Sequence, residues 1–185
     1  MPARSPRGRR GVALLLIDFL NPLDFPGAER MRKAAFAAAR RTAALKRKAR
    51  AAGISCIYCN DHFGMWDASA EQVIAAVEAA SEEGARLVSV LGPERGDVSI
   101  LKPRHSGFYG TPLEFLLDEL DASTLVIAGI AVDMCVLATA QDAHMRKFKL
   151  RVPSNCVAGF NRAEERSALL TMERTLDADT TPFRT

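Results

Sequence analysis

The stretch TLVIAGIAVDMCVLATAQDAHMRK, residues 124–147, joins an apolar run to a run with helix-like composition. Residues 124–130 are rich in Val, Ile and Leu, which is typical of a strand buried on both faces of a parallel sheet. Cys135 lies at the start of the second run. The stretch therefore predicts a strand followed by a helix, with a thiol at their junction.

The same alternation of strands and helices extends over the rest of the chain. Further strands are expected in GVALLLIDFL (11–20), ISCIYCND (54–61), VSILK (98–102) and LRVPSNCV (150–157). Expected helices cover residues 31–49, 69–81, 111–120 and 161–176, with N-caps at Ser69, Thr111 and Asn161 and with Pro112 in the first helical position. The order predicts an α/β fold of three layers, with a mostly parallel central sheet of about six strands in a Rossmann-like order and helices on both faces.

Length and composition predict one soluble domain. The chain has 185 residues, of which 48% are hydrophobic and 25% charged. We expect a single domain over residues 1–185, with residues 1–10 as a flexible basic tail. No apolar run reaches the 18 residues needed for a membrane span, and the short apolar run before Asp18 does not resemble a signal peptide. A cytoplasmic protein without a membrane partner is expected.

Positive charge is concentrated near the N-terminus. Residues 1–50 hold 13 Lys and Arg against 3 Asp and Glu, a net charge of +10, whereas the remainder of the chain carries −7. Aromatic residues do not alternate with these basic residues, which follow the polar face of the helix predicted over residues 31–49. We therefore expect no nucleic-acid partner.

Four cysteines are present, and the sequence predicts that they are reduced. Cys56 and Cys59 have the spacing of a redox or zinc pair, but both lie inside a predicted strand, and no second pair follows at zinc-ligand spacing. Cys156 also lies in a strand-like run. Cys135 is the cysteine that stands at a helix start.

Polar residues follow the predicted strands at the points where they end. These are Asp18, Asn60 with Asp61, Lys102 and, at the next helix start, Cys135. Ligands of open parallel sheets bind at the carboxyl ends of the strands, where these side chains meet. A helix start and an ammonium stabilise a thiolate, and a carboxylate can transfer its proton.

Each of these residues also has an ordinary structural interpretation. A cysteine after an apolar strand is often a small core residue, an aspartate there is often a turn residue, and Lys102 before Pro103 can be a loop charge. From residue types and spacing alone, catalysis and structure remain open alternatives.

Four segments resemble the isochorismatase-like cysteine hydrolase superfamily, which includes nicotinamidases and N-carbamoylsarcosine amidohydrolase. They are ALLLIDFLNPLDFPGAERM, IYCNDHFG, SILKPRHSGFYGTPLEFLL and TLVIAGIAVDMCVLATAQDAHMRKFKLRVPSNCVAG, and together they cover almost the whole chain. The resemblance implies the catalytic residues Asp18, Lys102 and Cys135, and a cis peptide bond between Ile130 and Ala131. It also implies an oxyanion hole formed by the N–H groups of Ala131 and Cys135, and a homodimer or homotetramer.

The implied activity is hydrolysis of a C–N bond in a small amide or carbamoyl or ureido substrate, through a thioester acyl-enzyme. Nicotinamidases bind a metal through an Asp-x-His pair and a further His, but here Asn60-Asp61-His62 places Asp and His side by side, and the next histidine is His105. No metal and no cofactor are therefore expected. A metal-assisted nicotinamidase-type amidase and a non-catalytic ligand-binding protein of the same fold remain alternatives.

Loop residues next to the three predicted catalytic residues are expected to bind the substrate. They are Phe19, Asn21, Phe25, Asn60, Trp66, His105, Phe108 and Met134. Phe, Trp and Met are more often core residues, so packing is the competing interpretation for those side chains. His62 and His105 lie in polar loops and can orient a substrate carboxylate or face water.

Overall fold

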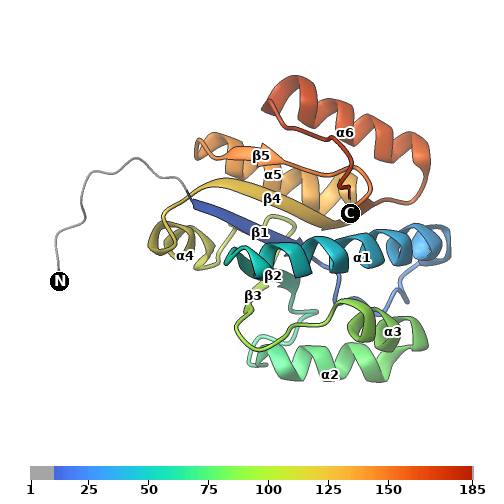
Figure 1. Ribbon diagram of the computed structural model, residues 1–185. Coiled ribbons are helices and arrows are strands. Elements are labelled where there is room, and N and C mark those ends of the chain that lie inside the picture. Colours follow the sequence, from blue (N-terminus) through green and yellow to red (C-terminus); the bar gives the residue numbers. More distant parts are fainter. Residues whose placement is uncertain (1–10, 185) are drawn as a thin grey trace.

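The computed structural model describes residues 11–184 and contains a six-stranded sheet in which every strand pair is parallel (Figure 1). The predicted basic tail, residues 1–10, lies outside the described residues. The strands are β1 (Gly11–Ile17), β2 (Ser55–Asp61), β3 (Val98–Lys102), β4 (Ala122–Ile130), β5 (Lys149–Arg151) and β6 (Val157–Ala158). The predicted α/β class with a parallel central sheet is confirmed.

The strand order is β3-β2-β1-β4-β5, with β6 also paired to β4. Residues 124–126 of β4 pair with β5, and Gly129 and Ile130 pair with β6. The two short strands therefore follow one another along the same edge of β4. A sixth strand that widens the sheet, as in a strict Rossmann order, is absent from residues 11–184. The single run expected over residues 150–157 is interrupted at Pro153, which has no N–H to donate to a neighbouring strand.

Helices cover both faces of the sheet (Figure 1). They are α1 (Ala28–Ala51), α2 (Ala70–Ala80), α3 (Glu82–Leu91), α4 (Leu113–Glu119), α5 (Leu137–Met145) and α6 (Arg162–Leu176). Buried residues of α1 and α3 form one apolar core with the sheet, and those of α4, α5 and α6 form the other. The two cores confirm the three-layer arrangement.

Two of the predicted helix starts are confirmed by side-chain caps. Ser69 accepts a hydrogen bond from the N–H of Gln72 and forms a capping box, and Asn161 caps α6. Helix α4 begins one residue later than expected, at Leu113, although the Thr111 hydroxyl still accepts its N–H at 3.2 Å. No helix is predicted from the sequence over RLVSVL, whereas in the structure this segment forms the end of α3.

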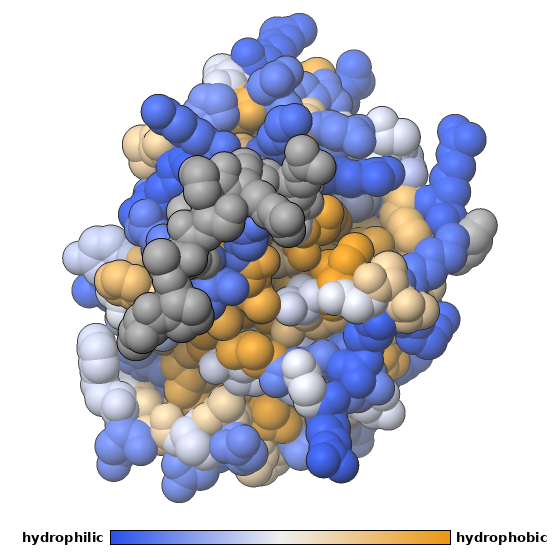
Figure 2. Space-filling model, turned by 60° about the vertical axis from the view of Figure 1, so that its left-hand side comes forward, coloured by the Kyte–Doolittle hydropathy of each residue, from blue (hydrophilic) through white to orange (hydrophobic). Residues whose placement is uncertain are grey.

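The surface that carries α4 has an apolar area in its middle, framed by hydrophilic residues (Figure 2). Phe115 in α4 is 77% exposed, which is high for a large apolar side chain.

Among residues 11–184, no helix is both long enough and apolar enough to cross a membrane.

Strand register brings the carboxyl ends of the central strands to one edge. Ile17 lies opposite both Cys59 and Gly129, and Asp61 lies opposite Lys102. Gly129 permits the close approach of β4 to β1, since a Cβ there would lie 2.4 Å from the carbonyl oxygen of Ile17. The residue after β1, Asp18, and the last residue of β3, Lys102, therefore lie close together.

Candidate active site

Asp18 leaves β1 with its backbone turned into the left-handed region, at a φ of 50°. Its N–H donates to the carbonyl of Cys59 at 3.2 Å, and its Oδ1 accepts the N–H of Asp61 at 2.8 Å. Its Oδ2 lies 2.8 Å from Nζ of Lys102. The carboxylate is 5% exposed, so a charged partner is needed to offset its removal from water.

Lys102 is completely buried. Its Nζ donates to Asp18 and to the carbonyl of Arg104 at 3.0 Å, and lies 3.7 Å from Sγ of Cys135. An ammonium has three N–H donors. Two of its directions are taken by oxygen atoms, and the third faces the thiol.

Cys135 lies in a π-helical turn, η1 (Val132–Val136), between β4 and α5. The expected cis peptide bond between Ile130 and Ala131 is present immediately before this turn. The thiol is partly exposed, and its Sγ lies 3.5 Å from Nδ1 of His105. The structure thus brings Asp18, Lys102 and Cys135 into one cluster.

The electrostatics of the cluster keep the thiol protonated. The pKa of Cys135 is raised to about 12, because burial and the carboxylate of Asp18 raise it by more than Lys102 lowers it. Burial also raises the pKa of Asp18 against the effect of Lys102. Burial lowers the pKa of Lys102, but the charges of Asp18 and Cys135 outweigh it, so the net shift is upward. Nucleophilic attack by this sulfur therefore requires a group that takes its proton.

Hydrogen bonds tie the loop after β3 to the helix that follows Cys135. The Ser106 hydroxyl donates to the carboxylate of Asp142, and the N–H of Gly107 donates to Oγ1 of Thr139 at 3.0 Å. Thr139 in turn donates to the carbonyl of Cys135 at 2.7 Å. Neither Thr139 nor Asp142 is among the site residues predicted from the sequence, so this connection between the loop and the helix is visible only in the structure.

The predicted substrate-binding residues lie in different environments. Met134 and His105 are exposed beside Cys135, and Trp66 is 78% exposed with its ring 4.3 Å from that of His62. Phe19 and Phe108 are buried in the two cores. Met134, His105 and Trp66 are therefore the members of the set whose side chains are exposed, while Asn21 and Phe25 are half-buried.

The amides Asn60 and Asn21 hold the backbone after β1. Asn60 accepts the N–H of Leu20 at 3.0 Å and donates to its carbonyl at 2.9 Å, while Asn21 accepts the N–H of Leu23 at 2.9 Å. The ring of Phe25 packs edge-on against that of Phe160, with 5.9 Å between the centroids. In this structure Asn60, Asn21 and Phe25 make contacts within the protein.

The residues near His62 do not fit a nicotinamidase-type metal site. Nδ1 of His62 accepts the N–H of Gly64 at 2.8 Å. A neutral imidazole with Nδ1 as acceptor carries its proton on Nε2, so neither nitrogen offers a free lone pair to a metal. Nε2 is buried without a partner, and residues 11–184 contain no group of three His, Cys, Asp or Glu side chains placed to hold a metal ion.

The Cys56 and Cys59 side chains belong to different cores. Cys56 packs in the core on the α1 face and Cys59 in the core on the α5 face. Residues three apart in a strand point to opposite faces, so the two thiols cannot act as a pair. All four cysteines are free, in agreement with the predicted reduced state.

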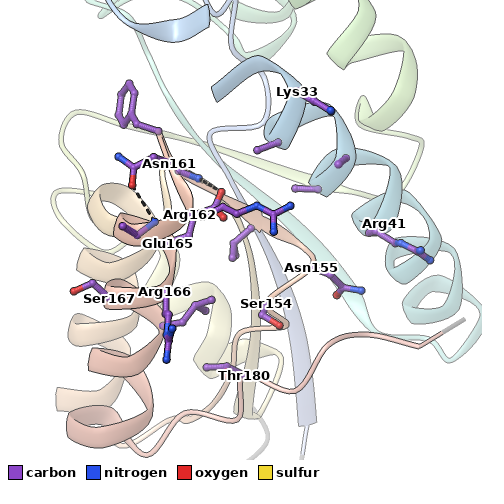
Figure 3. Close-up of a pocket in the computed structure, with 18 of the residues that line it drawn as sticks. Lys33, Arg41, Ser154, Asn155, Asn161, Arg162, Glu165, Arg166, Ser167 and Thr180 are labelled. Carbon is purple, nitrogen blue, oxygen red and sulfur yellow. Dashed lines mark hydrogen bonds between the residues drawn. The ribbon is translucent and has the colours of Figure 1, made fainter. Parts of the chain in front are cut away.

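A cavity of about 1730 Å³ lies between α1 and α6, beside β6 (Figure 3). Basic residues predominate among the charged side chains of its wall: Arg30, Lys33, Arg40, Arg41, Arg162 and Arg166, against Glu165 and Glu173. Asp18, Lys102 and Cys135 are not in its wall. The cluster at the strand ends is the better candidate active site, because it combines a nucleophile with groups that transfer or attract protons.

The family model of the isochorismatase domain matches residues 12–181. The chain belongs to the isochorismatase family. An uncharacterized isochorismatase family protein, YaaI of Bacillus subtilis, is 35% identical over 169 residues, which are 91% of this chain and 92% of that protein. Maleamate amidohydrolase of Pseudomonas putida is 31% identical over 80% of this chain and 72% of its own length.

Solved structures share the fold of this isochorismatase-family chain. An isochorismatase family protein of Desulfovibrio vulgaris superposes with a TM-score of 0.74 at 27% identity, over 94% of each chain. The resemblance inferred from the four sequence segments is therefore confirmed. The expected enzyme class, a hydrolase of C–N bonds other than peptide bonds, is confirmed at the level of the family and its amidohydrolase relatives.

Proposed function

We propose that this chain hydrolyses a C–N bond of a small amide, carbamoyl or ureido compound, with Cys135 as the nucleophile. The observation that carries the proposal is the convergence of three side chains from three strand ends, with Asp18 and Lys102 at 2.8 Å and Lys102 and Cys135 at 3.7 Å. The family and the name of the maleamate amidohydrolase relative support this reaction class.

In the first half of the reaction, Asp18 accepts the proton of the Cys135 thiol, whose pKa its carboxylate raises. The sulfur forms a bond to the substrate carbonyl carbon, and the carbonyl oxygen takes the negative charge. The N–H groups of Ala131 and Cys135 stabilise this oxyanion. The C–N bond then breaks as Asp18 donates its proton to the leaving nitrogen, which gives a thioester and an amine or ammonia.

In the second half, Asp18 takes a proton from water as the water oxygen attacks the thioester carbonyl. The C–S bond breaks, and the proton held by Asp18 returns to the sulfur. Lys102 stays charged throughout and stabilises whichever of its two neighbours is anionic, because its net pKa shift is upward. Atoms and protons balance over the cycle without a cofactor.

The direct test is ammonia release from primary amides, carbamoyl amino acids and ureido acids by the wild type and by Cys135→Ala. We expect release from at least one class, and its loss in Cys135→Ala. Cys56→Ala is the matched control, because Cys56 is a buried thiol in the core on the other face of the sheet. Equal activity of wild type and Cys135→Ala, or a thiol that does not react with iodoacetamide, would contradict this mechanism and favour a ligand-binding protein.

Nicotinamide is a weaker candidate substrate. The metal-assisted route needs a histidine nitrogen that binds the metal, whereas both nitrogens of His62 are unsuited to it in this structure. Nicotinamide hydrolysis that depends on added zinc or iron would overturn this reasoning. The expected homodimer or homotetramer and the expected cytoplasmic location remain predictions, and light scattering of the purified protein tests the first.

A further inference from the structure

We propose that the cavity between α1 and α6 binds an organic anion with two or more phosphate groups, of the kind represented by a nucleoside triphosphate. Such a site is separate from the cluster of Asp18, Lys102 and Cys135 and goes beyond the hydrolysis proposed above. The wall of the cavity holds six cationic side chains and two carboxylates, a net charge of +4. The cations are Arg30, Lys33, Arg40, Arg41, Arg162 and Arg166.

The protein itself does not neutralise these six cations. In the part of the chain that the structure describes, none of the six forms an ion pair with a carboxylate. Two other cations of α1, in contrast, are paired. Arg32 lies 3.0 Å from Glu83, and Lys46 lies 2.7 Å from Asp97. The positive charge of the cavity is therefore available to a ligand.

The two carboxylates of the wall are engaged elsewhere. Oε1 of Glu165 accepts the N–H of Gly159 at 3.0 Å, and Oε1 of Glu173 accepts the hydroxyl of Thr180. These hydrogen bonds hold the segments that follow β6 and α6. The two acids lower the positive field of the cavity, but neither of them occupies one of its cations.

The cations approach the cavity from two sides. Those of α1 extend from Arg30 to Arg41, which is about 16 Å along a helix axis. Those of α6 are Arg162 and Arg166, one helical turn apart. Arg162 extends from the start of α6 toward α1 (Figure 3). Like charges gathered around one space without counterions favour an anion between them.

The start of α6 adds to this attraction. The helix has 15 residues, and its first residue, Arg162, lies in the wall of the cavity. The N-terminus of a helix carries the positive end of the helix dipole, which favours anions. The dipole and the arginine side chains therefore act on a ligand in the same direction.

The composition of the wall indicates phosphate groups on an organic body. Five of the six cations are arginines, whose planar guanidinium binds phosphate through two parallel N–H donors. Between the cations the wall is largely apolar, with Ala34, Ala37, Phe160, Leu169 and Leu170. Apolar walls of this kind contact the uncharged part of a ligand. The volume of about 1730 Å³ also has room for far more than a single inorganic ion.

The test is isothermal titration calorimetry with ATP as the probe, without divalent metal ions. We expect binding at about 50 mM salt that weakens at about 200 mM, because salt screens the cations. Adenosine, which has no phosphate, should not bind measurably. Arg41→Gln and Arg162→Gln remove one guanidinium from each side of the cavity, and each should raise the Kd for ATP about 10-fold.

Arg47→Gln and Arg174→Gln are the matched controls. They remove the same charge from exposed positions of the same two helices, outside the wall of the cavity. Their Kd for ATP should stay within about 2-fold of the wild-type value. Arg41 and Arg162 are exposed as well, so all four variants should fold like the wild type, which circular dichroism checks.

Absence of ATP binding at about 50 mM salt would overturn the inference. An equal loss of affinity in the wall variants and the control variants would also overturn it, because the attraction would then be a property of the whole surface. A single-stranded oligonucleotide that binds more tightly than ATP would replace the small ligand by a nucleic acid. Ammonia release is not part of the readout, so anion binding and the proposed hydrolysis can fail separately.

Discussion

Two buried lysines, Lys46 and Lys102, have very different surroundings. Both are at most 2% exposed. Nζ of Lys46 has four oxygen partners, namely the Tyr58 hydroxyl at 2.9 Å, the Gly92 carbonyl at 2.9 Å, Asp97 at 2.7 Å and Glu94 at 3.0 Å. Nζ of Lys102 has two oxygen partners and a sulfur at 3.7 Å.

The difference indicates what each charge does. Burial lowers the pKa of Lys46, but hydrogen bonds to Asp97 and Tyr58 outweigh it and the net shift is upward, as it is for Lys102. Both ammoniums are therefore held in the charged state. The ammonium of Lys46 contacts only oxygen atoms and connects α1 to Tyr58 of the sheet. The ammonium of Lys102, in contrast, also contacts the thiol of Cys135. Burial of a lysine thus does not by itself identify a catalytic site.

The largest effect is expected for Lys102→Met. The substitution removes the cation that stabilises the thiolate, so hydrolysis per folded molecule should fall about 10³-fold. The measurement is the ammonia-release assay with the substrate found for the wild type. Activity within a few-fold of the wild type would show that the Lys102 charge is structural, like that of Lys46.

For Lys46→Met a large loss of stability is expected, without a loss of activity per folded molecule. It leaves Asp97 and Tyr58 buried without the ammonium, which should cost about 3–5 kcal/mol in the free energy of unfolding. For a domain of this size, the melting temperature should fall by about 10 °C. Activity per folded molecule should stay near the wild-type value, and a selective loss of activity without a lower melting temperature would contradict the structural role.

Asp18→Asn should separate thiol reactivity from hydrolysis. The Asp18 carboxylate raises the pKa of Cys135, so its replacement by a neutral amide leaves Lys102 unopposed and lowers that pKa from about 12. More thiolate is then present at pH 8, and alkylation by iodoacetamide should be about 10-fold faster. Hydrolysis should be lost, because no carboxylate remains to carry the proton. Slower alkylation would mean that Asp18 stabilises the thiolate.

The smallest effect is expected at an exposed ion pair. Arg146 Nε lies 2.9 Å from Glu114 Oε2, and the Glu114 side chain is 51% exposed. Glu114→Gln should change the free energy of unfolding by less than about 1 kcal/mol, because solvent screens such pairs. Chemical denaturation measures the change. A loss comparable to that of Lys46→Met would mean that burial is not what separates these ion pairs.

Much of the site was predictable because strand ends are visible in the sequence. Apolar runs that end in Asp18 and Lys102, and a run that leads to Cys135, are sufficient to place the three residues at one edge of a parallel sheet. The roles of the polar residues around these three could not be predicted from the sequence in the same way. Asn60 was expected to bind substrate, but it is 2% exposed and its amide holds Leu20 from both sides.

Errors in the predicted fold arose where partners outside a segment decide its conformation. The run over residues 150–157 has strand composition, yet it divides into β5 and β6 because both halves share the edge of β4. RLVSVL has the composition of a short strand, but it continues a helix that Ser81 caps through the N–H of Gly84. Local composition does not contain the partner that selects between these states.

The sequence by itself determined the α/β class, the order of most elements and the positions of Asp18, Lys102 and Cys135. These follow from local periodicity, turn residues and the rule that parallel strands end at one edge. Only the tertiary structure decided that His105 contacts the thiol and that Nδ1 of His62 is occupied. Such contacts join residues that are far apart in the chain or depend on side-chain orientation, and neither is encoded in spacing.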